Sequence, residues 1–214
     1  TVRRATLHNA DQIEKLDLRI GDTVYVEKGG EVIPKITGVD LKKRNKNSEP
    51  VVYVKKCPDC GTKLERKEGE VQHYCPNITG CPTQIKGRIE HFISRRAMNI
   101  DSLGEGKIEM LFDNGLIHNP ADLYNLKYEN IIGLEKVIEN EEGGKPKKIS
   151  LQEKSVQKIL KGIEESKEVA FERVLYAMGI RYVGETVAKK LALHFKSIDA
   201  ISKATVAELV EAEA

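Results

Sequence analysis

All four cysteines of the chain fall between residues 57 and 81, and no other feature of the sequence constrains the fold as strongly. Two residues separate Cys57 from Cys60, and five separate Cys75 from Cys81. Four thiolates suit a tetrahedral Zn²⁺ at about 2.3 Å per bond, and a full Cys₄ set leaves no position for water. The spacing therefore predicts a structural zinc site formed by Cys57, Cys60, Cys75 and Cys81, with a short strand at residues 71–74 leading into the third ligand.

Two disulfide bonds or four unrelated thiols are the alternatives. Disulfides need an oxidising compartment, and nothing in the sequence resembles a secretory segment. His73 could replace one cysteine as a ligand, although four cysteines already complete a tetrahedral site. No apolar run approaches the length of a membrane span, so no membrane partner is expected.

Length and charge limit the number of domains and the kind of partner. A chain of 214 residues can hold one large domain or two to three small ones. The net charge is only +2, but Lys and Arg outnumber Asp and Glu in residues 1–100, and the reverse holds afterwards. The basic first half indicates a polyanionic partner. Because the chain begins with Thr1 and its last residues continue a helical pattern, we expect a piece of a longer protein.

Residues 1–56 have the pattern of a small β-barrel. Asn9, with Gln12 three residues later, is typical of a capping box at the start of a short helix. Strands are expected at residues 23–27, 32–36 and 50–54. Several short strands in so short a segment favour an OB-type barrel. The basic run at residues 42–47 fits either a solvated loop or a phosphate contact.

A helix is expected directly after Cys81, where proline is tolerated in the first turn. Its apolar face would consist of Ile85, Ile89, Phe92 and Ile93. Its basic residues lie off that face and are Lys86, Arg88, Arg95 and Arg96. They fit either an ordinary solvated surface or a cationic ridge along a nucleic-acid backbone.

A weak internal repeat relates two glycine-containing segments, residues 103–107 and 178–184, each followed by an apolar helical pattern. A shift of 78 residues superposes Gly106 on Gly184 and matches the expected caps Asn119 and Ser197. Glycine lets a turn approach another backbone closely, and the next helix offers unpaired N–H groups to a phosphate. Such a helix-hairpin-helix grips DNA without reading bases, whereas the alternative is a plain αα-corner with a glycine cap.

The segment between the two copies is polar and then helical. Residues 139–148 read as an exposed insertion. Helix is expected to resume at Gln152, with an apolar face formed by Val156, Ile159, Leu160 and Ile163. The turn at residues 150–155 lacks the glycine of the two repeats, so we expect it to bind DNA weakly.

Several strings, in their order, resemble the C-terminal part of bacterial NAD⁺-dependent DNA ligases. Residues 4–9 (Arg-Ala-Thr-Leu-His-Asn), 19–24 (Arg-Ile-Gly-Asp-Thr-Val) and 30–34 (Gly-Glu-Val-Ile-Pro) are similar to the OB domain of that family. The cysteine spacing resembles its zinc finger, and residues 179–186 (Gly-Ile-Arg-Tyr-Val-Gly-Glu-Thr) resemble one of its hairpins. The resemblance covers essentially the whole chain.

The resemblance implies a multidomain α+β fold. Its expected parts are an N-terminally truncated OB barrel at residues 1–56, a Cys₄ zinc finger at 57–82 and an all-α, C-terminally truncated helix-hairpin-helix domain at 83–214. The implied DNA-binding residues are Arg4, Thr6 and His8 in the barrel and, in the hairpins, Gly104, Gly106, Lys107, Gly179, Arg181, Gly184 and Lys189. The implied partner is nicked duplex DNA, bound by a monomer at the nucleoid in the bacterial cytoplasm.

The resemblance also implies the activity of the longer protein, which would seal nicks in replication and repair. AMP would pass from NAD⁺ to a lysine and then to a 5′-phosphate, before attack by the 3′-hydroxyl with Mg²⁺. That lysine belongs to a Lys-x-Asp-Gly motif, and this chain contains no Asp-Gly dipeptide. We therefore expect NAD⁺ and Mg²⁺ to bind mainly outside this chain, Zn²⁺ to bind within it, and no catalytic residue here.

Two other functions remain open. One is a zinc-stabilised, non-catalytic DNA-binding scaffold of a repair or recombination complex. The other is an RNA-binding OB protein, which paired hairpins suited to a regular duplex disfavour.

Overall fold

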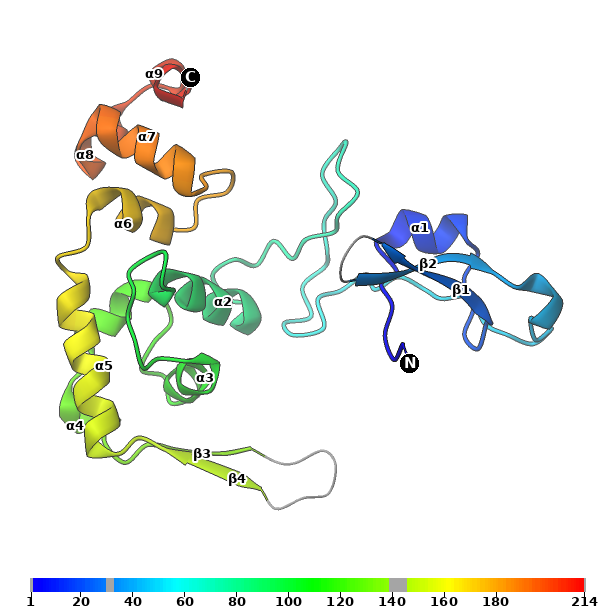
Figure 1. The fold of residues 1–214 in the computed structure, drawn as a ribbon, viewed down its shortest axis with the longest axis horizontal. Coiled ribbons are helices and arrows are strands. Elements are labelled where there is room, and N and C mark those ends of the chain that lie inside the picture. The colour runs from blue at the N-terminus through cyan, green and yellow to red at the C-terminus, as the bar shows by residue number, and fades with distance from the viewer. Residues whose placement is uncertain (1, 30–32, 139–145, 214) are drawn as a thin grey trace. The chain divides into compact units, whose positions relative to one another are not determined.

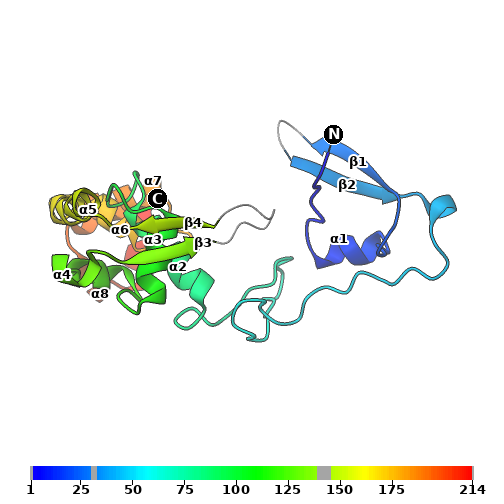
Figure 2. The same ribbon diagram turned by 90° about the horizontal axis from the view of Figure 1, so that it is seen from below.

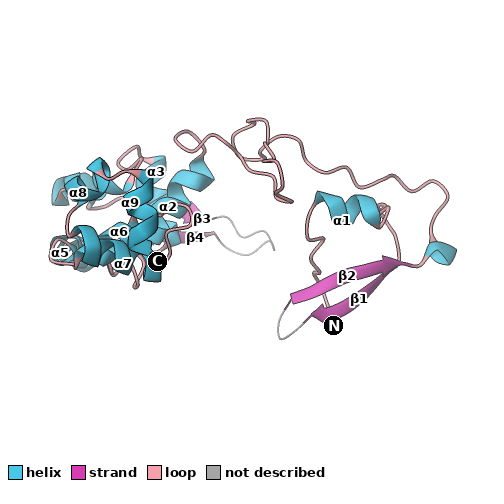
Figure 3. Cartoon of the chain, turned by 90° about the horizontal axis from the view of Figure 1, so that it is seen from above, coloured by secondary structure: helices cyan, strands magenta, loops and turns pink. Residues whose placement is uncertain are grey.

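The computed structural model describes residues 2–29, 33–138 and 146–213. The chain forms two compact units, Thr1–Cys81 and Pro82–Ala214. Loops make up most of the segment between the first sheet and Cys81, whereas helices make up most of the second unit (Figures 1 and 3). No helix in the described ranges is both long and apolar enough to cross a membrane. The three predicted domain limits stay a prediction.

The first unit begins with a short helix and a two-stranded sheet. α1 (Ala10–Lys15) starts at Asn9, whose side-chain oxygen accepts a hydrogen bond from the N–H of Gln12 at 3.0 Å. The predicted helix cap is therefore confirmed. β1 (Val24–Gly29) and β2 (Ile33–Val39) pair in antiparallel register, which confirms the first two predicted strands over their described residues.

The third predicted strand, residues 50–54, is wrong. Among the described residues its ladder is a single bridge between Pro50 and Arg19, and Val52 and Val54 are exposed. The described part of this unit therefore has a two-stranded sheet and no closed barrel. An apolar, β-branched run forms a strand only where a neighbouring strand supplies the ladder partners, and the local sequence does not specify that neighbour.

The basic run at residues 42–47 is neither wholly solvated nor wholly available to a phosphate. Arg44 places two of its nitrogens 3.0 and 2.9 Å from the carboxylate oxygens of Asp22, and it also contacts Asp17. The side chain of Asp22 is only 2% exposed, so this ion pair lies inside the unit. Arg44 lowers the pKa of the Asp22 carboxyl through these hydrogen bonds. Arg44 therefore fixes the loop onto the turn that precedes β1.

The second unit is a set of helices around a large apolar core, with a smaller apolar cluster between α6 and α7. The helices are α2 (Pro82–Ile93), α3 (Glu105–Asp113), α4 (Tyr128–Ile131), α5 (Glu153–Ser166), α6 (Phe171–Ala177), α7 (Glu185–Phe195), α8 (Ile198–Lys203) and α9 (Val206–Glu213), with a 3₁₀ helix over Pro120–Asn125. The predicted apolar faces of α2 and α5 are buried in this core, apart from Leu160, which is partly buried. The helical spacing of the apolar residues agrees with their burial, as expected of amphipathic helices.

A β-ribbon interrupts the part that was predicted to be all helical. β3 (Glu135–Ile138) pairs with β4 (Lys147–Ser150) in antiparallel register, and the ribbon extends from the base of α5 (Figures 1 and 2). Residues 139–145 of the predicted insertion lie outside the described residues. The ammonium of Lys136 lies 2.6 Å from the Glu109 carboxylate on α3. Tertiary contacts thus fix the base of a segment whose sequence reads as a polar loop.

The end of α2 is attached to α6 by side chains that contact carbonyl groups. The Nε2 atom of His91 lies 2.8 Å from the carbonyl oxygen of Tyr176, and the two rings meet edge to face. Arg173 donates to the carbonyls of Arg95, at 2.6 Å, and Arg96, at 3.3 Å. These bonds fix the start of the α6–α7 loop on the rest of the unit.

Candidate metal centre and nucleic-acid interface

The structure brings the four cysteine sulfur atoms together. All four lie within 4.8 Å of one another, with 3.9 Å between Cys57 and Cys81 and 3.5 Å between Cys60 and Cys75. A tetrahedron with bonds of about 2.3 Å has edges of about 3.8 Å, so the cluster fits Zn²⁺. The cysteines are free of disulfide bonds, which removes the main alternative.

Two tight turns deliver the cysteines in pairs. In the first, the N–H of Gly61 donates to the carbonyl of Cys57 at 2.9 Å, with Gly61 at φ +70°. That conformation favours glycine. In the second, the carbonyl of Asn77 accepts from the N–H of Cys81 at 3.0 Å. Each pair is therefore positioned by backbone geometry that is encoded within a few residues.

His73 is outside the cluster. Its ring packs against Tyr53 with the ring centres 4.9 Å apart, and its Nδ1 atom is buried without a hydrogen-bond partner in the described structure. The strand predicted just before Cys75 is reduced to one bridge, in which Tyr74 and Glu65 exchange backbone hydrogen bonds. Nearby, Arg66 forms a bidentate pair with Asp11 of α1 at 2.7 Å, which attaches the cysteine module to the first helix.

Two of the thiols differ sharply in acidity without metal. Hydrogen bonding from Thr62, whose hydroxyl oxygen lies 3.2 Å from the sulfur, lowers the pKa of Cys60 to about 6. Burial raises the pKa of Cys75 to about 12. Because zinc binds thiolates, metal binding near neutral pH must displace a proton from Cys75, while Cys60 is already mostly ionised.

We therefore expect the zinc affinity of this chain to fall as the pH falls. Between about pH 8 and pH 6 the affinity should fall at least about tenfold for each pH unit of acidification, because Cys75 must lose its proton to bind zinc, and protonation of Cys60 steepens the fall below about pH 6. Competition with a chromophoric chelator across pH, corrected for protonation of the chelator, measures this slope. An affinity independent of pH between about 5 and 8 would contradict the assignment of Cys75 as a ligand.

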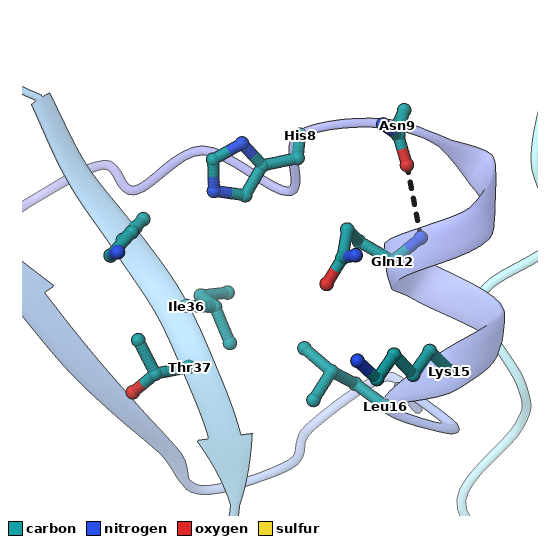
Figure 4. Close-up of a pocket in the computed structure, with 8 residues that line it drawn as sticks. His8, Asn9, Gln12, Lys15, Leu16, Ile36 and Thr37 are labelled. Carbon is teal, nitrogen blue, oxygen red and sulfur yellow. Dashed lines mark hydrogen bonds between the residues drawn. The ribbon is translucent and has the colours of Figure 1, made fainter. Parts of the chain in front are cut away.

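One of the three candidates in the first unit, His8, lines a concave surface, and the other two precede it in the chain. Thr6 forms a parallel bridge with Lys35, and its hydroxyl accepts from the N–H of His8 at 3.1 Å. His8 has φ +60° and lines a cavity of about 460 Å³ between α1 and β2 (Figure 4). Arg4 is exposed on the segment just before. Lys15 and Lys35 line the same cavity, and the sequence analysis did not single them out.

Two turns of the second unit share one backbone geometry. We call residues 98–104 the first hairpin and residues 178–184 the third hairpin, because the turn at residues 150–155 lies between them in the chain. Each leads into a helix, α3 or α7, whose first residue follows a glycine N-cap. Each has positive φ at its second and fifth residues, with values of 54° and 69° in the first and 65° and 69° in the third. The equivalent pairs are Asn99 with Gly179, Ser102 with Tyr182, and Gly104 with Gly184.

This geometry corrects the predicted repeat. The hairpins superpose with a shift of 80 residues, so Gly104, not Gly106, is equivalent to Gly184. The expected caps do keep the shift of 78, because Asn119 and Ser197 are both N-caps that accept backbone N–H groups. The difference arises in the connection after each helix: residues 114–118 separate α3 from Asn119, whereas Lys196 alone separates α7 from Ser197, and this outweighs the greater length of α7, 11 residues against 9.

Gly106 and Lys107 face the protein interior to different extents. A Cβ on Gly106 would meet the side chain of Ile149 at 3.5 Å. The ammonium of Lys107 donates to the carbonyl of Ser102 at 2.6 Å and to the hydroxyl of Ser155 at 2.9 Å. Burial, and next the charge of Lys158, lowers the pKa of Lys107. Lys107 therefore joins the first hairpin to α5.

The remaining candidates lie on or after the third hairpin. Gly179 has φ +65°, and a Cβ added there would lie 3.5 Å from the ring of His91. The guanidinium of Arg181 lies 5.1 Å from the ring centre of Tyr182. Lys189 is exposed on α7. Sequence reasoning missed Tyr182, although the string Met-x-Ile-x-x-x-Gly-Glu occurs at residues 98–105 and again at 178–185.

The turn at residues 150–155, the second hairpin position, lacks a glycine in the sequence, but the fold brings to it a glycine that precedes the insertion. Gly133, at φ +75°, donates its N–H to the carbonyl of Leu151 at 2.9 Å, and Leu151 donates to Leu134. The β3–β4 ribbon stands between Leu134 and Leu151, so the glycine is separated in sequence from the α5 N-cap Gln152. The insertion replaces the middle of this hairpin.

Comparison with known proteins agrees with these parts. Family models match the NAD-dependent DNA ligase OB-fold domain at residues 1–48, the NAD-dependent DNA ligase C4 zinc finger domain at 56–82, and the helix-hairpin-helix motif at 173–213. A DNA ligase of Flavobacterium psychrophilum is 57% identical over 209 residues, and one of Bacteroides fragilis is 56% identical over 209 residues. Each alignment covers 98% of this chain and 29% of the relative.

A Cys₄ zinc site followed by repeated helix-hairpin-helix turns defines a zinc-finger protein of the helix-hairpin-helix class. The OB and zinc-finger matches narrow this class further: the chain matches, in order, the OB-fold and C4 zinc finger domains of NAD-dependent DNA ligases and is similar to DNA ligases over 98% of its own length. It spans about 29% of the length of the relatives that it matches. The resemblance read from the sequence is therefore confirmed.

Proposed function

We propose that this chain is the part of an NAD⁺-dependent DNA ligase that grips duplex DNA at a nick. The observation that carries the proposal is the pair of equivalent hairpins, each ending in a glycine N-cap with no side-chain hydrogen bond to the helix. A bare N-cap leaves the first N–H groups of α3 and α7 available to a phosphate. Paired turns that contact phosphates suit a regular duplex backbone better than an irregular RNA.

The longer protein would supply the chemistry. In this proposal it transfers AMP from NAD⁺ to a lysine outside this chain, then to the 5′-phosphate, and the 3′-hydroxyl closes the nick with Mg²⁺. This chain contributes binding and orientation, with Arg4, Thr6 and His8 as the candidates nearest the nick. The Cys₄ module would hold its own turns in place without a reactive metal, because four thiolates fill the coordination sphere.

The site of action follows from the same proposal. A thiolate zinc site suits a reducing compartment, so we propose that the protein works as a monomer on the bacterial nucleoid in the cytoplasm. The rival function is a non-catalytic scaffold in a repair or recombination complex. A Lys-x-Asp-Gly motif in the upstream reading frame would favour the ligase, and its absence would favour the scaffold.

Fluorescence anisotropy with labelled nicked duplex tests the binding itself. We expect the logarithm of affinity to fall linearly with the logarithm of salt concentration, because phosphate contacts release counterions. Changing the base sequence at constant length should leave affinity within about twofold, since hairpins contact the backbone. Matched intact duplex, single strand and double-stranded RNA are the competitors. Equal or tighter binding of the RNA, or dependence on one base sequence, would refute the proposal.

A further inference from the structure

Tyr182 is the most exposed large hydrophobic side chain in the part of the chain that the structure describes. It is 80% exposed at the fifth residue of the third hairpin, in the loop that joins α6 to α7 (Figure 1). Soluble proteins commonly expose single apolar side chains, so exposure alone decides nothing. The backbone of Tyr182 supplies the second observation.

Tyr182 has φ +69°, in the left-handed region that a bulky side chain rarely adopts. The hairpin requires this conformation, because the equivalent Ser102 has the same φ of 69°. Glycine or asparagine would meet the requirement with less strain. The chain instead places an aromatic residue there and leaves most of it in water, which gives the fold no compensating burial. Strain of this kind persists where a function uses the side chain.

The surroundings of Tyr182 indicate what that function is. Met178 and Ile180, on the same hairpin, are 50% and 44% exposed, so the hairpin presents further apolar surface to the solvent. The guanidinium of Arg181 lies over the ring at 5.1 Å. Two residues later, Gly184 begins α7 with its bare N-cap. The tip of the hairpin therefore combines an apolar surface, a cation and the start of a helix, all within one turn.

A duplex backbone offers the complement of this combination. Its phosphates are anionic, and the faces of the deoxyribose rings between them are apolar. We propose that the ring of Tyr182 packs against the sugar faces of the bound strand while Arg181 contacts the neighbouring phosphate. This inference rests on the proposed function and adds to it the residue that makes the apolar contact. The first hairpin, with Ser102 at the same position, makes the weaker contact of the two.

The decisive variant is Tyr182→Asn, because asparagine tolerates positive φ better than tyrosine. We expect its thermal midpoint to equal or exceed that of the parent, while its affinity for nicked duplex DNA falls about fivefold to tenfold. Tyr182→Phe keeps the ring and should bind within about twofold of the parent. Because the lost contact is apolar, the dependence of affinity on salt should not change in either variant.

Two further variants complete the test: one is a matched control, and the other removes the proposed phosphate contact. Tyr128→Asn makes the same substitution at an exposed tyrosine that is the first residue of helix α4, and we expect no change in affinity and no gain in stability. Arg181→Ala should instead reduce the salt slope by about one phosphate contact.

Each outcome decides one question. A parent chain that binds no duplex DNA refutes the proposed function. A parent that binds, together with a folded Tyr182→Asn variant of equal affinity, overturns the role of Tyr182 alone. That role is also overturned if Tyr182→Phe binds as weakly as Tyr182→Asn, because the ring would then make no contribution. Should Tyr182→Asn melt well below the parent, the residue is structural and the inference is wrong.

Discussion

Replacing Cys75 with alanine is expected to remove the zinc and to unfold the cysteine module. Cys75 supplies one of four sulfur atoms that lie within 4.8 Å of one another. A site with three thiolates and no fourth ligand should bind zinc more than about 100-fold more weakly, since even outer contacts of a metal site are worth 10- to 100-fold. The module has little apolar core apart from Cys57 and Cys81, so metal binding supplies most of its folding free energy.

The zinc content of the purified variant measures this effect, and its circular dichroism shows which part unfolds. The matched control is His73→Phe, which keeps an aromatic ring against Tyr53 and removes a histidine that lies outside the sulfur cluster. We expect the control to retain one zinc per chain. A Cys75→Ala variant with stoichiometric zinc would show that the four sulfurs are not one site.

The second large effect is expected at the N-cap glycines of the two hairpins. A Cβ added to Gly104 or Gly184 meets no atom of the protein within 4 Å, and neither residue has positive φ. Serine is a better N-cap than glycine, so Gly184→Ser should keep or raise the stability of α7. Its side chain would occupy the approach to the N–H groups and lower DNA affinity about tenfold, the usual value of one hydrogen bond to a charged group.

Gly104→Ser should lower DNA affinity in the same way. In the double variant the two losses of DNA affinity should combine. Gly106→Ala is the control, because alanine keeps the backbone N–H at the second residue of α3, its added Cβ faces Ile149 of the protein, and alanine improves helix propensity. It should keep DNA affinity and gain stability. Thermal melts beside DNA titrations separate the two kinds of effect. Serine variants that remain folded and bind DNA like the parent would exclude phosphate contacts at these helix starts.

The sequence alone determined the features that depend on neighbouring residues. The four cysteines, with Gly61 closing the turn directly after Cys60, specify a zinc site because the metal needs only four sulfurs on two tight turns. The caps Asn9, Asn119 and Ser197 were predicted for the same reason, since a cap accepts N–H groups two or three residues away. The apolar faces of α2 and α5 follow from helical periodicity.

Other features were decided only by contacts between distant segments. Arg44 reads as one more basic loop residue until the fold brings Asp22 to it. The glycine of the second hairpin, Gly133, is separated from Leu151 by an inserted ribbon, so no local pattern could join them.

The equivalence of Gly104 with Gly184 likewise needed the backbone. Two glycines, Gly104 and Gly106, compete for one position in the sequence, and only the φ values and helix starts distinguish them. The strain and exposure of Tyr182 also appear only in the folded backbone, through its positive φ and its 80% exposed side chain. Side-chain patterns specify local structure because their partners lie within a turn or two, whereas register, loop closure and backbone strain are settled by packing across the whole unit.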